Sequence, residues 1–246
     1  MRIETNRFGV RKSPSRREVL SGAAALAAAI ATRGAGVGPS TAWADEPVAG
    51  GVSPDEALRR LVEGNARYVS GAIQHKDFSA NREALAQKQA PHTIVLGCAD
   101  SRVPPELAFD QGRGDLFVVR VAGNAVDTGL LASIEYAVRF LGSRLVLVLG
   151  HSNCGALDAA IKVVEDDAKL PGHLPELIGE LRPAVLAGKG RPGDKLANSI
   201  RANVELNVAE LAASKPVLAE LVSSGQVRVV GGIYDLATGK VEFLGS

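Results

Sequence analysis

The sequence predicts an α/β fold, in which a mostly parallel central β-sheet (four parallel strands plus an antiparallel edge strand) is flanked by helices. The first observation is a series of continuous apolar runs, which are typical of strands buried on both faces of a parallel sheet. The second is that helical stretches alternate with these runs, a pattern that indicates a parallel sheet covered by helices. The third is the composition, 46% hydrophobic and 22% charged over 246 residues, which is typical of a globular domain.

The charge balance excludes some classes of partner. The formal net charge is +1, so the chain has no strong attraction to nucleic acid or to an anionic surface. We therefore expect no nucleic-acid partner and no stable membrane association. The length alone suggests one domain or two, and the sequence holds no internal repeat.

The first 44 residues resemble an export signal rather than part of the fold. A basic start is followed by a short apolar stretch at 19–31, and residues 42–44 (AWA) offer a small-x-small pattern for cleavage after Ala44. The stretch at 15–20, SRREVL, resembles the twin-arginine signal, which exports proteins already folded. The apolar stretch is too short to span a bilayer of about 30 Å. An amphipathic N-terminal helix of a cytosolic protein is the alternative.

This interpretation divides the chain into three parts. We expect a cleavable twin-arginine signal peptide at 1–44, a flexible arm at 45–52 and one folded domain at 53–246. The twin-arginine export machinery is then a partner, and the mature protein is periplasmic or otherwise exported. A thiolate–metal protein would suit this route, because it can load its metal in the cytoplasm before export.

The elements of the folded domain follow from capping signals and periodicity. Ser53 and Pro54 start a helix that runs to about Ser70, because Ser is a preferred N-cap and Pro a preferred first helical residue. We expect further helices at 79–89, 128–141, 155–167, 195–214 and 216–223, and strands at 92–98, 115–122, 144–151 and 227–235. The stretch at 235–244 predicts a turn into an antiparallel edge strand. The Pro- and Gly-rich stretch at 171–192 predicts a surface excursion.

Both cysteines lie at the ends of predicted strands. Cys98 closes the first strand, and His151 and Cys154 follow the third. In open parallel sheets ligands bind at the carboxyl ends of the strands, so these side chains converge if the two strands are neighbours. Zinc prefers thiolate and imidazole ligands, and a helix start at Cys154 favours the thiolate. The three residues are therefore candidate ligands for one Zn²⁺ per chain.

Two other interpretations of the cysteines stay open on this reasoning. Cys98 and Cys154 could form a disulfide in an oxidising compartment, or they could be two buried, inert thiols. The disulfide leaves His151, Asp100 and Arg102 unexplained.

Asp100 and Arg102 follow the first cysteine closely, and such a pair is usually a surface ion pair of little energy. Next to a metal it has a use, because Arg102 can hold Asp100 ionised and fixed in direction. Asp100 then has no proton to donate, and it can only accept a hydrogen bond from a zinc-bound hydroxide. Hydrogen bonds of this kind help a zinc ion that two thiolates have neutralised.

Four sequence blocks, CADSRVPPE, FVVRVAGN, EYAV and GHSNCGAL, resemble the signature blocks of the β-class carbonic anhydrases. The resemblance covers the chain from about Ser53 to its end. It implies zinc held by Cys98, His151 and Cys154, with a catalytic dyad at residues 100 and 102. It implies a lyase, carbonate dehydratase, that hydrates CO₂ reversibly to bicarbonate and a proton by zinc-hydroxide attack. It also implies a homodimer or higher homo-oligomer, whose active sites lie near the subunit interface.

The resemblance also predicts a substrate pocket of the plant-like branch of this family. Gln89, Phe117 and Tyr136 stand at the positions that line the CO₂ pocket in that branch, although they could also be a helix-end residue and two core residues. Val95 stands where the other branch carries a Trp that helps to build an inhibitory bicarbonate site. We therefore expect an open site, with water on the zinc and the catalytic dyad paired.

Two glycines complete the predicted site. Gly123 and Gly155 match the family blocks and are expected where the backbone approaches the site closely, although ordinary loop and helix-start glycines would look the same.

Three rival functions remain. One rival is a relative that hydrolyses CS₂ or COS at the same zinc site. The others are a non-catalytic zinc-binding protein and a disulfide-stabilised binding protein.

Overall fold

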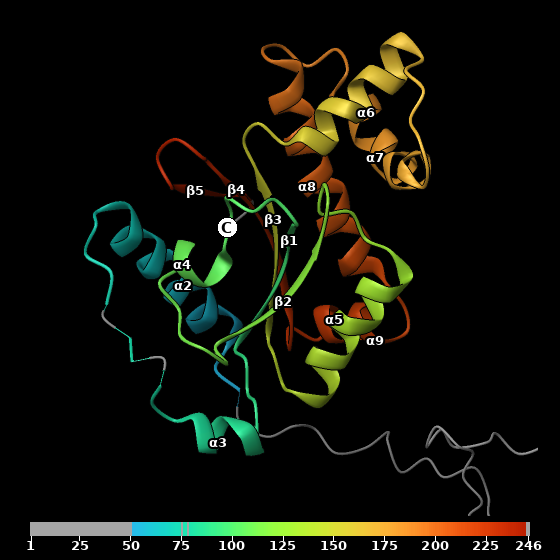
Figure 1. Ribbon diagram of the computed structural model, residues 1–246. Helices are drawn as coiled ribbons and strands as arrows, with labels where there is room; N and C mark the ends of the chain where they lie inside the picture. The colour runs from blue at the N-terminus through green and yellow to red at the C-terminus, as the bar shows by residue number, and fades with distance from the viewer. Residues whose placement is uncertain (1–50, 75, 78, 245–246) are drawn as a thin grey trace, which may run out of the picture. The chain divides into compact units, whose positions relative to one another are not determined.

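The computed structural model describes residues 51–244 except positions 75 and 78, and the account below concerns these residues (Figure 1). The predicted signal peptide at 1–44 and all but the last two positions of the predicted arm at 45–52 lie outside the described residues. The elements, in chain order, are α2 (Pro54–Val69), α3 (Arg82–Gln87), β1 (Thr93–Cys98), α4 (Pro105–Ala108), β2 (Leu116–Val121), α5 (Thr128–Phe140), β3 (Leu145–His151), α6 (Gly155–Asp166), α7 (Leu174–Gly188), α8 (Lys195–Ala213), α9 (Val217–Ser223), β4 (Arg228–Tyr234) and β5 (Val241–Leu244). Among the described helices, none is both long and apolar enough to cross a membrane.

A single five-stranded sheet forms the centre of this part of the chain. The strand order is β2-β1-β3-β4-β5, with parallel pairing between the first four strands and antiparallel pairing between β4 and β5. The predicted fold class is therefore confirmed. The central pair, β1 and β3, runs side by side with Gly97 opposite Leu149, so the carboxyl ends of both strands lie at one edge of the sheet.

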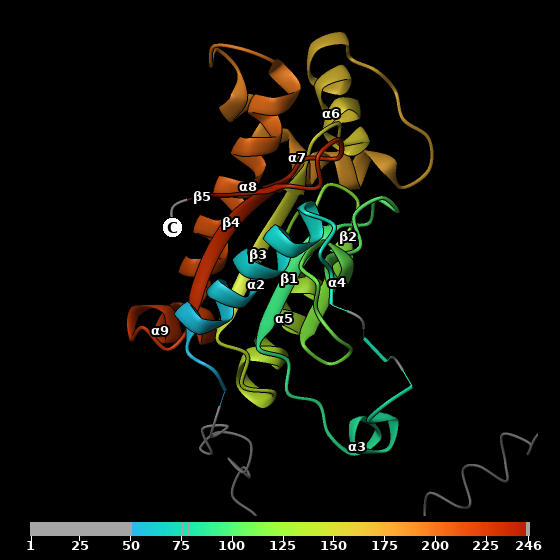
Figure 2. The ribbon, with the colours of Figure 1, turned by 90° about the vertical axis from the view of Figure 1, so that its left-hand side faces the viewer.

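Helices cover both faces of the sheet, as Figures 1 and 2 show. Val95 faces a core that α2 and α4 close, whereas its neighbours Ile94 and Leu96 face the opposite core, to which α5, α8 and α9 contribute. Successive residues of a strand point to opposite faces, so a strand with a core on each side must be apolar throughout. Every residue of β1 and of β3 is buried, which explains their continuous apolar runs.

The strand β2 differs from its prediction. Its apolar run predicted a strand buried on both faces, but β2 pairs only with β1 and forms the edge of the sheet. Val119 is its single buried residue, and the others are partly or fully exposed. A run of apolar letters therefore does not distinguish a central strand from an edge strand whose open side is apolar.

The predicted surface excursion at 171–192 is wrong, because most of it forms the helix α7, which packs against α6 and α8. Pro175 lies in the first turn, where proline is tolerated, and Pro183 lies inside the helix. The helix nevertheless buries an apolar stripe at helical spacing, Ile178, Leu181 and Val185. The energy of burying this stripe outweighs the local cost of the internal proline.

Two smaller elements also differ from expectation. The helix predicted at 79–89 is limited to the six residues of α3, and none of them is buried. In Figure 1, α3 lies away from the sheet, at the end of a long connection from α2. The single turn α4, which follows the segment after β1, was not predicted.

Candidate metal centre

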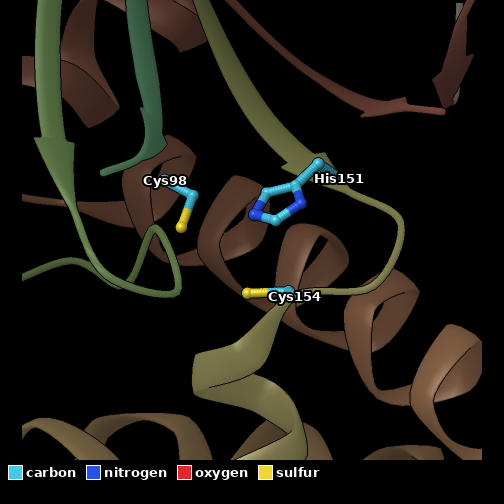
Figure 3. A group of neighbouring side chains, drawn as sticks. All are labelled: Cys98, His151 and Cys154. Carbon is cyan, nitrogen blue, oxygen red and sulfur yellow. The ribbon is translucent and has the colours of Figure 1, made fainter. Parts of the chain in front are cut away.

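The three predicted ligands meet at the edge of the sheet where β1 and β3 end (Figure 3). Cys98 is the last residue of β1, His151 is the last residue of β3, and Cys154 is the N-cap residue of α6. Their ligand atoms all lie within 4.8 Å of one another, and the side chains point into one shared space. All three residues are at most 5% exposed. The strand order thus brings together residues that are more than 50 positions apart in the sequence.

The imidazole of His151 is oriented for metal binding. Its Nδ1 lies 2.9 Å from the main-chain oxygen of Ser152. A carbonyl only accepts, so Nδ1 carries the proton and Nε2 keeps a free lone pair. Nε2 is buried and has no hydrogen-bond partner, although buried polar atoms nearly always have one. An orphaned imidazole nitrogen beside two sulfur atoms fits a zinc ligand set, and the carbonyl of Ser152 holds the imidazole in place.

The two thiols influence each other's ionisation. A hydrogen bond from Cys154 lowers the pKa of the Cys98 thiol, and burial opposes this shift only in part. The main-chain N–H of Gly123 also donates to the Cys98 sulfur, at 3.2 Å. The same thiol–thiolate bond, together with burial, raises the pKa of Cys154. A divalent cation would replace the shared proton, which supports a metal site, and both cysteines are free rather than joined in the alternative disulfide.

Asp100 and Arg102 form a two-point ion pair beside the cluster. Arg102 donates from Nε to Oδ1 of Asp100 at 2.9 Å and from Nη2 to Oδ2 at 2.7 Å, and its main-chain N–H donates to Oδ1. These hydrogen bonds hold the pKa of the Asp100 carboxyl well below its usual range. The carboxylate oxygen Oδ2 lies 3.8 Å from Nε2 of His151. The carboxylate of this pair therefore lies beside a candidate metal ligand, which is not expected of an ordinary surface ion pair.

Comparison with known proteins agrees with this geometry. Residues 93–241 match the family model described as carbonic anhydrase. Carbonic anhydrase 2 of Mycobacterium tuberculosis is 39% identical over 189 residues, which cover 76% of this chain and 91% of the relative. The chain belongs to the β-class carbonic anhydrases. Its activity is therefore that of a zinc-dependent lyase, carbonate dehydratase.

Solved structures of the β class share the fold. The β-carbonic anhydrase of Coccomyxa in complex with acetazolamide is 31% identical, with a TM-score of 0.60 over 76% of this chain and 86% of that one. A structure from a study of two tetrameric β-carbonic anhydrases of Sordaria macrospora is 27% identical, with a TM-score of 0.58 over 78% of this chain and 98% of that one.

The three predicted pocket residues do not converge on the metal ligands of the same chain. Phe117 pairs with Ile94, four residues before Cys98 along the strands, which corresponds to about 13 Å. Tyr136 lies next to Phe117, with 6.4 Å between ring centroids. Gln89 is exposed and precedes β1, whose first residue lies about 16 Å from its last. Within one carbonic anhydrase chain these residues therefore cannot line a pocket at the zinc ligands.

The two predicted glycines differ from each other. Gly123 has φ of +79°, and a Cβ there would lie 2.6 Å from Cδ1 of Leu181, so this position requires glycine. Its N–H reaches the Cys98 sulfur as a consequence of that conformation. Gly155 is the first residue of α6, and a Cβ there would meet open space. A Cβ would thus clash at Gly123 but not at Gly155 within this chain, and the substrate-pocket role expected of both glycines stays a prediction.

Sequence reasoning missed the residues that support the ligands. Ser152 supplies the carbonyl for His151, and its side-chain oxygen accepts from the N–H of Leu236 at 2.9 Å. On α8, Asn203 donates to the carbonyl of Gly123 at 2.8 Å. Ser152 could have been suspected, because it lies inside the GHSNCGAL block. Asn203 gives no such signal, because it is 80 residues away from the glycine that it contacts.

Proposed function

We propose that this chain hydrates CO₂ reversibly to bicarbonate and a proton, with Asp100 and Arg102 as the catalytic pair beside the zinc ligands. One observation carries the proposal: Oδ2 of the Asp100 carboxylate lies 3.8 Å from the orphaned Nε2 of His151, whose ligand atom is within 4.8 Å of both cysteine sulfur atoms. A carboxylate on an ordinary exposed loop has no reason to lie so close to a buried imidazole nitrogen that lacks a partner.

Each ligand is prepared by its own surroundings. The Cys98 sulfur accepts a hydrogen bond from the N–H of Gly123, which favours its thiolate form, and the Ser152 carbonyl fixes His151 in the tautomer that leaves Nε2 free. Cys154 lies at the N-terminus of α6, where the main-chain N–H groups of Ala156 and Leu157 favour a negative sulfur. When bound, zinc supplies the Lewis acidity that gives a water nucleophile at near-neutral pH.

Asp100 directs a proton, and Arg102 keeps it available as an acceptor. Because Arg102 holds the carboxyl ionised, Oδ2 of Asp100 can only accept a hydrogen bond. A donor placed between Oδ2 and the ligand atoms must point its hydrogen at Asp100 and its lone pair away from it. The lone pair is then oriented toward an incoming CO₂. While Asp100 is paired with Arg102, it is not itself a fourth metal ligand. This pairing is the arrangement expected of an open site.

A homodimer of the plant-like branch explains the position of the pocket residues. In one chain Phe117 and Tyr136 lie on the partly exposed side of β2 and α5, far from the chain's own zinc ligands. Tyr136 is 46% exposed and its neighbour Phe140 is 41% exposed. A second copy packed on this aromatic surface would bring its own Phe117 and Tyr136 toward the zinc site, with the exposed Gln89 available to donate to a bicarbonate oxygen. The exposed surface thus supports a pocket that two subunits build together.

Export by the twin-arginine route is the second part of the proposal. The SRREVL stretch at 15–20 and the AWA stretch at 42–44 support a signal that is removed after Ala44. A pair of buried cysteines would be oxidised in an oxidising compartment without protection, and bound zinc provides it. We infer that the carbonic anhydrase is folded and loaded with zinc before it reaches the periplasm.

The experiment that tests the catalytic proposal compares two aspartates. The mature chain, purified without chelator, should contain about one zinc and hydrate CO₂, and removal of the zinc should abolish the hydration. Asp100→Asn should lower kcat by roughly 10²–10⁴-fold with zinc content unchanged, because a side-chain amide can donate a hydrogen bond where the carboxylate only accepts one. Asp158→Asn is the matched control, since Asp158 lies on α6 in an exposed ion pair with Lys162.

The alternatives give different results in the same assay. A non-catalytic zinc protein would bind the metal without hydrating CO₂, and a hydrolase of COS or CS₂ would act on those substrates instead. Full hydration activity in the Asp100→Asn variant would contradict the role assigned to the carboxylate.

A further inference from the structure

The segment between β1 and α4 carries the catalytic pair, yet little of it is buried. Residues 99, 101 and 102 are exposed, and Asp100 is partly exposed. Two main-chain hydrogen bonds shape the segment, from Val103 N–H to the Asp100 carbonyl at 3.1 Å and from Ala99 N–H to the Val121 carbonyl at 3.0 Å. The first bond closes a turn from Asp100 to Val103, and the second attaches Ala99, the first residue of the segment, to β2. They do not fix the direction in which the turn projects over the zinc ligands.

Arg120, on the neighbouring strand β2, contacts this segment at three points. Its Nε donates to the carbonyl of Cys98 at 2.8 Å, and its Nη2 donates to the carbonyl of Asp100 at 2.6 Å and to that of Val103 at 3.1 Å. The three acceptors span the segment from the zinc ligand to the residue that closes the turn. One side chain therefore connects the end of β1 with both ends of the turn that carries Asp100.

The chemistry of arginine suits this arrangement. A guanidinium group is planar, stays charged, and presents several N–H donors in fixed directions, so it can serve three carbonyls at once. Hydrogen bonds from a charged donor are shorter and stronger than those between neutral groups. A lysine at the same position would offer a single flexible ammonium group, which matches fewer of these directions.

We propose that Arg120 is a positioning residue for the catalytic reaction. It holds the main chain of the segment so that the Asp100 carboxylate lies beside Nε2 of His151. Without Arg120, the Asp100–Arg102 pair can persist but moves away from the zinc ligands as a unit. This inference rests on the catalytic role proposed for Asp100, and it goes further by naming the residue that places the carboxylate.

Hydrogen exchange tests the positioning without relying on activity. In Arg120→Ala, the amides of residues 99 and 103 should exchange roughly tenfold faster, in the zinc-loaded and in the zinc-free protein, because the segment opens more often. Arg113→Ala is the matched control, since Arg113 also donates to a main-chain carbonyl, that of Ala80, at 3.0 Å on an exposed surface. Arg120→Lys should fall between wild type and Arg120→Ala. Unchanged exchange in both Arg120 variants would overturn the proposal.

A double-mutant cycle separates positioning from general damage. Arg120→Ala should lower kcat about tenfold with zinc content and KM little changed, but less than about twofold in a chain that already carries Asp100→Asn. An equal loss in both backgrounds would mean that Arg120 does not act through Asp100, which overturns the proposal. If Arg120→Ala does not fold, the same comparison is made with Arg120→Lys. If the wild-type chain does not hydrate CO₂, the proposed function fails, while hydrogen exchange still decides whether Arg120 holds the segment.

Discussion

At the residue scale, the site depends on main-chain partners as much as on its reactive side chains. His151 is oriented by the Ser152 carbonyl, Cys98 is supported by the Gly123 N–H, and the Asp100 segment is held through its carbonyls by Arg120. Sequence spacing indicates the ligands and the Asp100–Arg102 pair, because those side chains are set by chemistry. It does not indicate which carbonyl or N–H supports them, because any residue type can supply a main-chain group.

Gly123 offers a direct test at this scale. Gly123→Ala should lower the free energy of unfolding by about 1–2 kcal/mol, because an L-residue is strained at positive φ and the new Cβ would meet Leu181. It should also speed the transfer of zinc to a chelator, because the shift moves the N–H away from the Cys98 sulfur. Denaturant titration and chelator kinetics measure the two effects.

Gly155→Ala is the control for that substitution, because a Cβ at Gly155 meets open space at the start of a helix. It should leave stability and zinc release close to wild type. Equal behaviour of the two variants would show that the Gly123 conformation does not matter for the metal site.

At the element scale, the sequence predicts the central strands better than the periphery. β1 and β3 are predicted within one residue at each end, because burial on both faces demands unbroken apolar runs. The helix α7 was missed because local signals, two prolines and several glycines, oppose a helix that packing against α6 and α8 nevertheless stabilises. The exposure of β2 could not be foreseen, because strand order depends on long-range pairing.

The open side of β2 and α5 leads to the prediction about assembly. If two subunits share each pocket, Asp100→Asn and Tyr136→Ala each inactivate the enzyme. The first substitution damages the subunit that holds the zinc of a given site, and the second damages the partner subunit that completes the pocket. Mixed dimers of the two variants should then recover activity that neither has alone, because one site per dimer contains an intact Asp100 and an intact Tyr136. The mixed dimers are isolated with two different affinity tags, and CO₂ hydration is measured.

Oligomeric state provides the accompanying control for the assembly. Tyr136→Arg should shift the protein toward the monomer in light scattering, because it places a charge on the aromatic surface, whereas Leu186→Arg on α7, where Leu186 is also exposed, should not. A monomeric wild-type enzyme with full activity would contradict the shared pocket.

At the scale of the whole molecule, the fold class and the metal site follow from the sequence for one physical reason. Parallel strands end at the same edge of a sheet, so the ligand-bearing strand ends can meet once β1 and β3 are neighbours. The pocket could not be assigned in the same way. Gln89, Phe117 and Tyr136 are separated from the chain's own zinc ligands by the length of a strand, so the pocket role proposed for them would require a second molecule.

The route of export gives the last prediction. If the chain follows the proposed twin-arginine route, replacement of Arg16 and Arg17 by lysine should keep the protein in the cytoplasm with its first 44 residues uncleaved, because that transporter reads the arginine pair. The matched control replaces Arg11 by lysine, outside the SRREVL stretch, and should leave export and cleavage after Ala44 intact. Fractionation and mass spectrometry of the N-terminus measure both.

The state of the retained protein then shows when the metal enters. If zinc is bound before export, the cytoplasmic double-lysine variant should already contain about one zinc and hydrate CO₂, and its two thiols should resist labelling until it is unfolded and stripped of metal. Continued export of that variant would indicate a general secretory route, in which the chain crosses unfolded and must bind zinc afterwards. Cys98 and Cys154 would then meet the oxidising compartment without metal. Once the chain has folded, their Sγ atoms lie within 4.8 Å of each other, so a disulfide would compete with zinc for the same two sulfur atoms.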